Sequence, residues 1–197
     1  MFAVIFEVQP RAERWNEYLD LAKLLKPELE RVDGFIDNER FASRRTEGRL
    51  LSLSTWRDEK AVIRWRTLAL HHQVQEKGRF ELFEDYHLRV GEIVADTHIP
   101  EGQQLQDQRL DETEVGAAKR VTISEGSIDG TPPAGPGLID QELFESLSSP
   151  GKRLLLAAWR DAVPAPPGDR LRHRQVRVIR DYGMADRREA PQYYPPV

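Results

Sequence analysis

One stretch of the sequence combines an aromatic ring with groups that can transfer protons. Trp65, His71 and His72 lie in a run whose apolar residues recur with helical spacing. On a continuous helix, Trp65 and His72 are seven residues apart and share a face, whereas His71 points about 100° away. Histidine titrates near neutral pH, so either residue could accept or donate a proton beside a small cavity. The structural alternative is that Trp65 packs in the core and both histidines lie on the helix surface.

Two further residues could act on a bound molecule. Glu7 is the one charge in the apolar segment FAVIFEV. Facing a cavity, it could serve as a general base whose pKa is tuned by burial; at a strand end, it would instead pair with an arginine. Tyr86 could donate to a ligand oxygen or to a backbone group. Tyr182, in Asp181-Tyr182, repeats the Asp85-Tyr86 pair, which favours a structural role for both.

Several common kinds of site are excluded or disfavoured by the sequence. The absence of cysteine rules out disulfides and thiolate metal ligands. His72 and Glu76 are one helical turn apart, but no third ligand at suitable spacing accompanies them, so no metal site is predicted. The sequence contains neither a glycine-rich phosphate loop nor the elbow of a serine hydrolase. The arginines that alternate from Arg170 to Arg180 are expected to form a solvated strand face.

Composition points to a globular protein. The chain has 197 residues, of which 39% are hydrophobic, enough to bury a core. A net charge of −4 argues against a nucleic-acid partner. No apolar run approaches the ~20 residues of a membrane span, and Phe2–Phe6 is too short for a signal segment. We therefore predict a cytoplasmic protein without a membrane partner.

The chain contains an internal duplication. Segments Asp37–Asp58 and Asp140–Asp161 align without a gap at an offset of 103 residues, and ten of the 22 positions are identical. Agreement at this level indicates a duplicated structural unit.

The first copy has the pattern of a ferredoxin-like unit. Apolar alternation and helical periodicity predict the order β-α-β-β-α-β, an α+β fold. The expected strands are Met1–Val8, Phe35–Ser43, Arg49–Trp56 and Phe80–Val94. The expected helices run from about Trp15 to Val32, before Gly34, and from the N-cap Asp58 to Gly78. We assign this domain to residues 1–96.

The second copy, residues 118–197, is predicted to be a helix-poor sheet. Residues 97–117 are polar and acidic and read as a linker. Lys119–Glu125 repeats the first strand, with Glu125 in the position of Glu7, but Gly- and Pro-rich segments at 126–137 and 163–168 replace both helices. A bare sheet must bury one face. We expect it to pack on the first sheet, as an intrachain pseudo-dimer, or on a partner subunit in a homodimer.

Residues 1–95 resemble the antibiotic biosynthesis monooxygenase family of the dimeric α+β barrel superfamily. The resemblance rests on FAVIFEV, on LLSLSTWRDEKAVIRW, and on HHQVQEKGR followed by FEDYHLRV. It implies that two sheets form a barrel and that a small cavity lies between sheet and helices. Some members oxidise aromatic substrates with molecular oxygen and without a metal or flavin.

A related branch of the superfamily degrades haem. That branch uses a tryptophan and a histidine on the second helix, which Trp65 and His71 or His72 could match, and an asparagine on the first strand. Here the corresponding stretch is Phe6-Glu7-Val8, which argues against haem. The favoured function is thus a cofactor-independent monooxygenase acting on a small aromatic organic molecule, with oxygen as co-substrate. The alternative is a non-catalytic ligand-binding or assembly protein on the same barrel.

Overall fold

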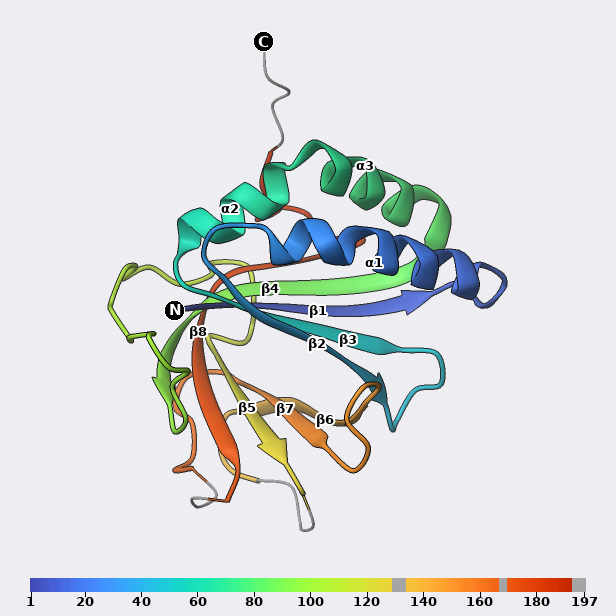
Figure 1. Cartoon of the computed structure of the whole chain (residues 1–197). Helices are drawn as coiled ribbons and strands as arrows, with labels where there is room; N and C mark the ends of the chain where they lie inside the picture. Colours follow the sequence, from blue (N-terminus) through green and yellow to red (C-terminus); the bar gives the residue numbers. More distant parts are fainter. Residues whose placement is uncertain (129–133, 167–169, 193–197) are drawn as a thin grey trace.

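The computed structural model of the chain describes residues 1–128, 134–166 and 170–192. Within them, eight strands close one barrel in the order β1-β3-β2-β6-β7-β5-β8-β4, with every neighbouring pair antiparallel (Figure 1). The strands are β1 (Phe2–Pro10), β2 (Phe35–Ser43), β3 (Leu50–Trp56), β4 (Phe83–Asp96), β5 (Arg120–Gly126), β6 (Leu138–Ser146), β7 (Arg153–Trp159) and β8 (Arg172–Gly183). The helices are α1 (Trp15–Glu30), α2 (Glu59–Thr67) and α3 (Ala69–Lys77), with short turns η1 (Ala12–Arg14) and η2 (Gly78–Leu82).

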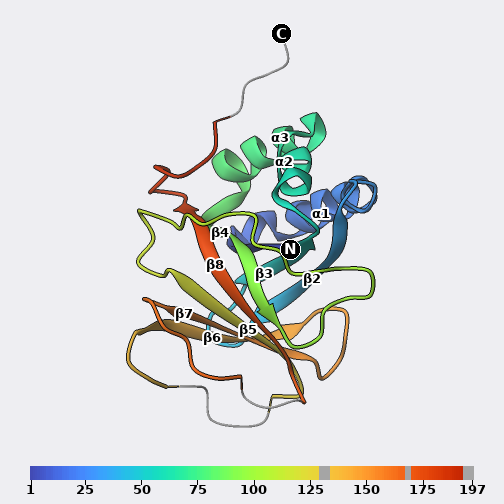
Figure 2. The same cartoon turned by 90° about the vertical axis from the view of Figure 1, so that its left-hand side faces the viewer.

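The barrel is built from both copies of the repeat within one chain. Strands β1 to β4 form one half and β5 to β8 the other, and two seams join them where β2 pairs with β6 and β4 pairs with β8. The helices α1, α2 and α3 all cover the outer face of the first half (Figures 1 and 2). In the second half the described residues contain no helix. Residues 129–133, 167–169 and 193–197 lie outside the described residues, and so do the parts of the predicted Gly- and Pro-rich segments and of the end of the second copy that fall on them.

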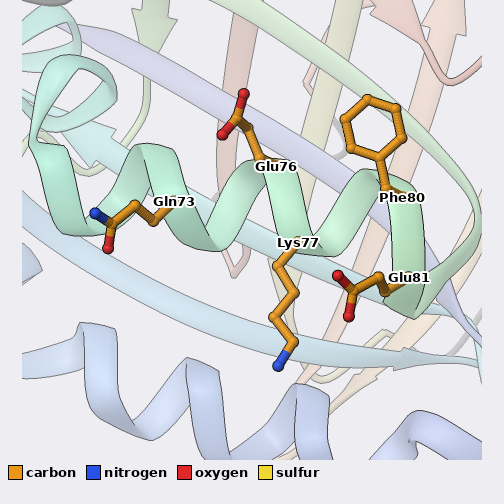
Figure 3. Close-up of a pocket in the computed structure, with 5 residues that line it drawn as sticks. All are labelled: Gln73, Glu76, Lys77, Phe80 and Glu81. Atoms are coloured by element: carbon orange, nitrogen blue, oxygen red, sulfur yellow. The ribbon is translucent and has the colours of Figure 1, made fainter.

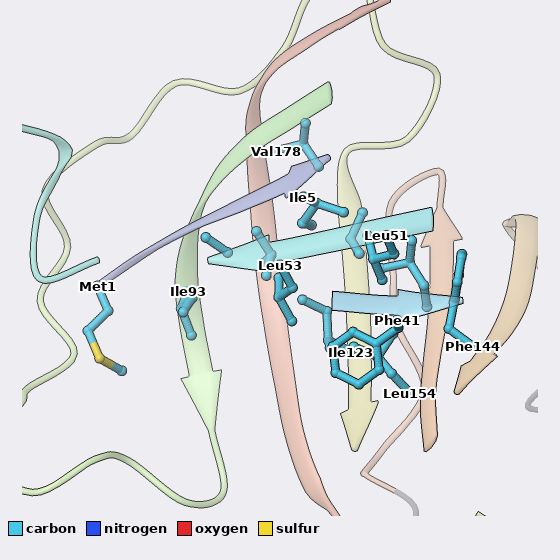
Figure 4. Close-up of a cluster of buried hydrophobic side chains, with 14 residues drawn as sticks. Met1, Ile5, Phe41, Leu51, Leu53, Ile93, Ile123, Phe144, Leu154 and Val178 are labelled. Carbon is cyan, nitrogen blue, oxygen red and sulfur yellow. The ribbon is translucent and has the colours of Figure 1, made fainter. Parts of the chain in front are cut away.

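The apolar core fills the inside of the barrel (Figure 4). Leu51 and Leu53 of β3 point inward, as do their repeat counterparts Leu154 and Leu156 of β7, and all four are at most 4% exposed. The expectation that the two sheets meet face to face is confirmed. Each such side chain contributes about 1.5–3 kcal/mol of burial free energy.

Charged residues complete the barrel interior. Glu7 accepts hydrogen bonds from Arg49 at 2.7 Å and Arg89 at 2.9 Å. Its repeat counterpart Glu125 is paired with Lys152 at 2.8 Å and with Arg174. The prediction that Glu7 would meet an arginine, as a structural residue, is confirmed in its placement.

The prediction of a solvated arginine face on the last strand is wrong. Arg174 is 1% exposed and pairs with Glu125, and Arg177 donates to Glu92 at 2.6 Å. Arg174 lies on the same face of β8 as Val176 and Val178 of the barrel core, whereas Arg177 lies on the opposite face. A buried carboxylate compensates the charge on each side of the sheet.

The second helix differs from its prediction. Asp58 caps α2 as expected, because its carboxylate accepts from the Ala61 amide at 2.8 Å. The helix then ends at Leu68, whose backbone is extended, and α3 begins afresh at Ala69. Thr67 Oγ1 donates to the Ile63 carbonyl at 2.9 Å, a local bond that bends helices. Gly78 also does not end the helical region, which continues as the π-type turn η2.

The segment between β4 and β5 has no regular secondary structure but is attached to the barrel. The buried Glu92 carboxylate accepts from the backbone amides of Gln108 at 2.6 Å and Arg109 at 3.2 Å.

None of the described helices has the length and apolar character that a membrane crossing requires.

We expect Leu156→Asp to lower the free energy of unfolding by about 3 kcal/mol or more, because it places an unpaired charge in the barrel core. The matched control is Leu147→Asp, since Leu147 is 54% exposed and should tolerate the charge. Urea denaturation of both variants measures the difference. Equal stability of the two variants would contradict the face-to-face core.

Candidate functional site

A cavity of about 430 Å³ lies between the first-half sheet and the helices. Its floor is the outer face of β2, β3, β1, β4 and β8, and its roof is formed by α1, α2, α3 and η2. This is the position that the family resemblance implied. The cavity lies on the opposite side of the sheet from the barrel core, so the barrel supports the site without lining it.

The floor consists of two rows of side chains that run across five strands. Cross-strand partners of this kind have Cβ atoms about 4.5–5.5 Å apart. One row is Arg40, Ser52, Phe6, Leu88 and Tyr182, and the next is Asn38, Ser54, Val4, Val90 and Arg180. The centre of the floor is therefore apolar, and both of its ends are polar.

At the β2–β3 end, the polar side chains hold one another in place. Asn38 Nδ2 donates to Ser52 Oγ and to the Leu53 carbonyl, both at 3.0 Å. Ser54 Oγ accepts from Trp56 Nε1 at 2.9 Å. Both hydroxyl oxygens thus act as acceptors in these bonds, so each hydroxyl hydrogen is available to a ligand.

At the β4–β8 end, two tyrosines face the cavity from neighbouring strands. Arg187 donates to the Tyr86 hydroxyl, and Tyr182 lies beside them. Burial, assisted by Tyr86, raises the pKa of Tyr182 to about 12, so it stays a neutral donor. The two are not repeat equivalents: Tyr86 pairs with Val8 of β1, whereas Tyr182 pairs with Leu88 of β4. The interpretation that Asp181-Tyr182 is the repeat copy of Asp85-Tyr86 is therefore wrong.

The roof contains Trp65 and His71 in direct contact. Their rings stack with centroids 3.9 Å apart at 17°, and His71 Nδ1 lies 2.9 Å from the Trp65 carbonyl. His72 also lines the cavity and lies 4.0 Å from Glu76. The expectation that His71 would point away from Trp65 is wrong, because the break at Leu68 re-aims every residue that follows it. Both histidines line the cavity together with Trp65.

His71 has the chemistry of a neutral base. Burial, the largest effect, lowers its pKa to about 4, and the neighbouring His72 acts in the same direction. The ring is therefore neutral at pH 7. Because a carbonyl can only accept, Nδ1 carries the proton, and Nε2 has a free lone pair.

Glu7 lies outside this site. Along β1, Val4 and Phe6 line the cavity, whereas Ile5 points into the barrel and Glu7, two residues on, lies on the same side. Its carboxylate is held by Arg49 and Arg89. The hypothesis that Glu7 approaches the cavity as a base is therefore not supported by its placement.

A second, shallow pocket of about 400 Å³ lies on the outer surface of α3 and η2 (Figure 3). It is lined by Gln73, Glu76, Lys77, Phe80 and Glu81, and Lys77 pairs with Glu17 of α1 at 2.6 Å. In the described part of the chain, no group of three or more histidine, aspartate or glutamate side chains is arranged to hold a metal ion.

Comparison with known proteins agrees with this architecture. A family model described as antibiotic biosynthesis monooxygenase matches residues 1–77. A protein of Pyricularia oryzae named jasmonate monooxygenase ABM is 44% identical over 219 aligned positions that cover 100% of both chains. The chain belongs to the antibiotic biosynthesis monooxygenase family.

One solved structure shows a similar fold in a distant protein. A crystal structure of aldoxime dehydratase is 10% identical, covers 90% of this chain and 81% of its own, and has a TM-score of 0.53. A crystal structure of an antibiotic biosynthesis monooxygenase is 15% identical and covers 48% of this chain and 100% of its own, with a TM-score of 0.43.

Sequence reasoning missed the polar floor of the cavity. The missed floor residues are Asn38, Arg40, Ser52 and Ser54, and Tyr18 of α1 in the roof was missed as well. The repeat did contain a signal for the strand residues. At the offset of 103, Arg40 corresponds to Leu143, Ser52 to Leu155 and Ser54 to Ala157. Polar residues that occur only in the half with helices mark the face on which the cavity lies.

The low pKa of His71 predicts a specific dependence of stability on pH. Between its ordinary pKa of 6.5 and about 4, the unfolded chain binds a proton that the folded protein does not, so stability falls as the pH drops through this window. On lowering the pH, we expect the free energy of unfolding of His71→Gln to fall by roughly 1–3 kcal/mol less than that of wild type, because each pKa unit corresponds to about 1.4 kcal/mol. Urea denaturation at pH 4.5 and 7 tests this, with exposed His98→Gln as the control. The same pH dependence in both variants would contradict a neutral, buried His71.

Proposed function

We propose that this protein is a monooxygenase that oxidises a small, largely apolar organic molecule with molecular oxygen and without a prosthetic group. The observation that carries the proposal is the pairing of an apolar cavity with a neutral histidine in its roof. Membership of the family and a full-length relative named as a monooxygenase support the reaction class. The cavity is the site, and its volume of about 430 Å³ suits a small molecule.

The proposed chemistry begins at a CH₂ group next to a carbonyl. His71 Nε2 accepts a proton from this carbon, and the resulting carbanion transfers electrons to O₂ to form a hydroperoxide. Loss of water then leaves a new carbonyl, so that R₂CH₂ + O₂ gives R₂C=O + H₂O. One oxygen atom enters the substrate and the other leaves as water, and no external reductant is consumed.

The cavity residues support this sequence in two ways. The forming anion would raise the pKa of nearby His71, because opposite charges attract strongly in a site that excludes water. The hydroxyls of Tyr86 and Tyr182 can donate hydrogen bonds at the floor and so stabilise negative charge on a substrate oxygen. Trp65 holds the His71 ring in position by stacking.

The first substrate to test is jasmonate, since it appears in the name of the relative that matches the whole chain. Jasmonate is a small cyclic ketone that carries a carboxylate, and it contains CH₂ groups next to its ketone. Aromatic ketones with an equivalent CH₂ group test the aromatic class expected from the family resemblance.

We expect oxygen uptake with one member of this panel, at one O₂ per product molecule. His71→Gln should reduce the rate about 10²–10⁴-fold, as loss of a general base does, while exposed His98→Gln should leave it unchanged. An oxygen electrode and mass spectrometry of the product measure both. Full activity in His71→Gln would remove this residue from the mechanism, and ligand binding without oxygen uptake would favour the non-catalytic binding protein.

A further inference from the structure

We propose that Arg40 binds a carboxylate group of the ligand, so that the cavity selects organic acids over their neutral esters. This inference rests on the proposed function, because it concerns the same cavity. It assigns the class of ligand and the residue that recognises it.

Arg40 belongs to the cavity and not to the barrel. It lies on β2 between Glu39 and Phe41, and Phe41 packs in the barrel core. Because side chains alternate along a strand, Arg40 points to the opposite face, where it lines the cavity beside Ser52. Its counterpart in the second half is Leu143, so the barrel does not require a charge at this position.

No acidic side chain among the described residues forms an ion pair with Arg40. Its Nε is buried without a hydrogen-bond partner. The guanidinium lies near the Tyr18 hydroxyl: burial raises the pKa of Tyr18, and Arg40 acts in the opposite direction. Barrel arginines such as Arg89 and Arg174 have carboxylate partners instead. A partly desolvated cation without a counter-charge is costly, and an anionic ligand would remove that cost.

The neighbours of Arg40 are also arranged as donors. The Ser52 hydroxyl accepts from Asn38 Nδ2, which leaves its hydrogen free for a ligand oxygen. A carboxylate only accepts hydrogen bonds and can take two from a guanidinium. Arg40 and Ser52, as direct cross-strand partners, therefore form a donor pair at one end of an apolar floor.

The acidic groups at the cavity do not compete for Arg40. Both carboxylate oxygens of Glu59 accept from Arg109 at 2.7 Å, and Glu76 lies near His72 with 64% of its side chain exposed. Other cations line the cavity elsewhere: Arg187 is bonded to Tyr86, Arg180 lies in the second row of the floor, and Arg66 of α2 lies in the roof. A carboxylate held by Arg40 would leave the apolar body of the ligand over Phe6 and Leu88.

The test measures binding under anaerobic conditions, so that turnover cannot affect it. Isothermal titration calorimetry compares jasmonate with methyl jasmonate, which differ only in the carboxylate. We expect wild type to bind the acid about 10–100-fold more tightly than the ester, as loss of a charged hydrogen bond implies. Arg40→Gln should weaken acid binding by that factor and leave ester binding unchanged, and Arg40→Lys should restore part of the preference.

The control is Arg31→Gln, because Arg31 is an exposed residue after α1 that pairs only with Glu28 at 2.8 Å among the described acidic residues. Thermal melting shows whether each variant is folded. If Arg40→Gln is not folded, the preference of Arg40→Lys for the acid over the ester decides the test. Equal binding of acid and ester by wild type, binding of neither, or loss of the preference in Arg66→Gln but not in Arg40→Gln would each overturn the inference. A preference that depends on Arg40, without oxygen uptake, would refute the proposed function alone.

Discussion

The structure depends on reciprocal hydrogen bonds from serine hydroxyls to carboxylates where the two repeats meet. Ser43 of the first half donates to Glu142 of the second, and Ser146 of the second half donates to Glu39 of the first. Each bond is the repeat equivalent of the other, at an offset of 103. A hydrogen bond to a charged group contributes about 1.5–3 kcal/mol. These carboxylates therefore fix the register of the β2–β6 seam, and the apolar core can fill the barrel only in that register.

Once the second half covers the inner face of the first sheet, the outer face of that sheet is free to form a site. The barrel core and the cavity share strands but not side chains: Ile5 and Phe41 point inward, while Phe6 and Arg40 point to the helices. The helices then need to cover only the cavity. The second half lacks helices in its described residues. Arg40, Ser52 and Ser54 of the floor correspond there to apolar residues, whereas Asn38 corresponds to Gln141.

The sequence was sufficient to predict the duplication, the order of strands and helices along the first half of the chain, the N-cap Asp58 and the packing of sheet on sheet. Each of these follows from a local pattern or from the repeat. The break at Leu68 was not predicted, since it depends on how Thr67 bonds within its own turn. The burial of Arg174 was not predicted either, because its partner Glu125 lies 49 residues away. Both errors affected the candidate site. The break at Leu68 places His71 beside Trp65, where a continuous helix would have placed His72. The buried carboxylates decide which arginines have an ionic partner.

Closure of the barrel within one chain also changes how the protein can evolve. In a barrel assembled from two identical chains, every substitution appears twice, once on each sheet. Here a change at Leu143 leaves Arg40 untouched, although both residues descend from one position of the repeat. Each half can therefore acquire mutations independently. Substitutions in the first half can change the cavity, and substitutions in the second half can change the sheet that packs against the first.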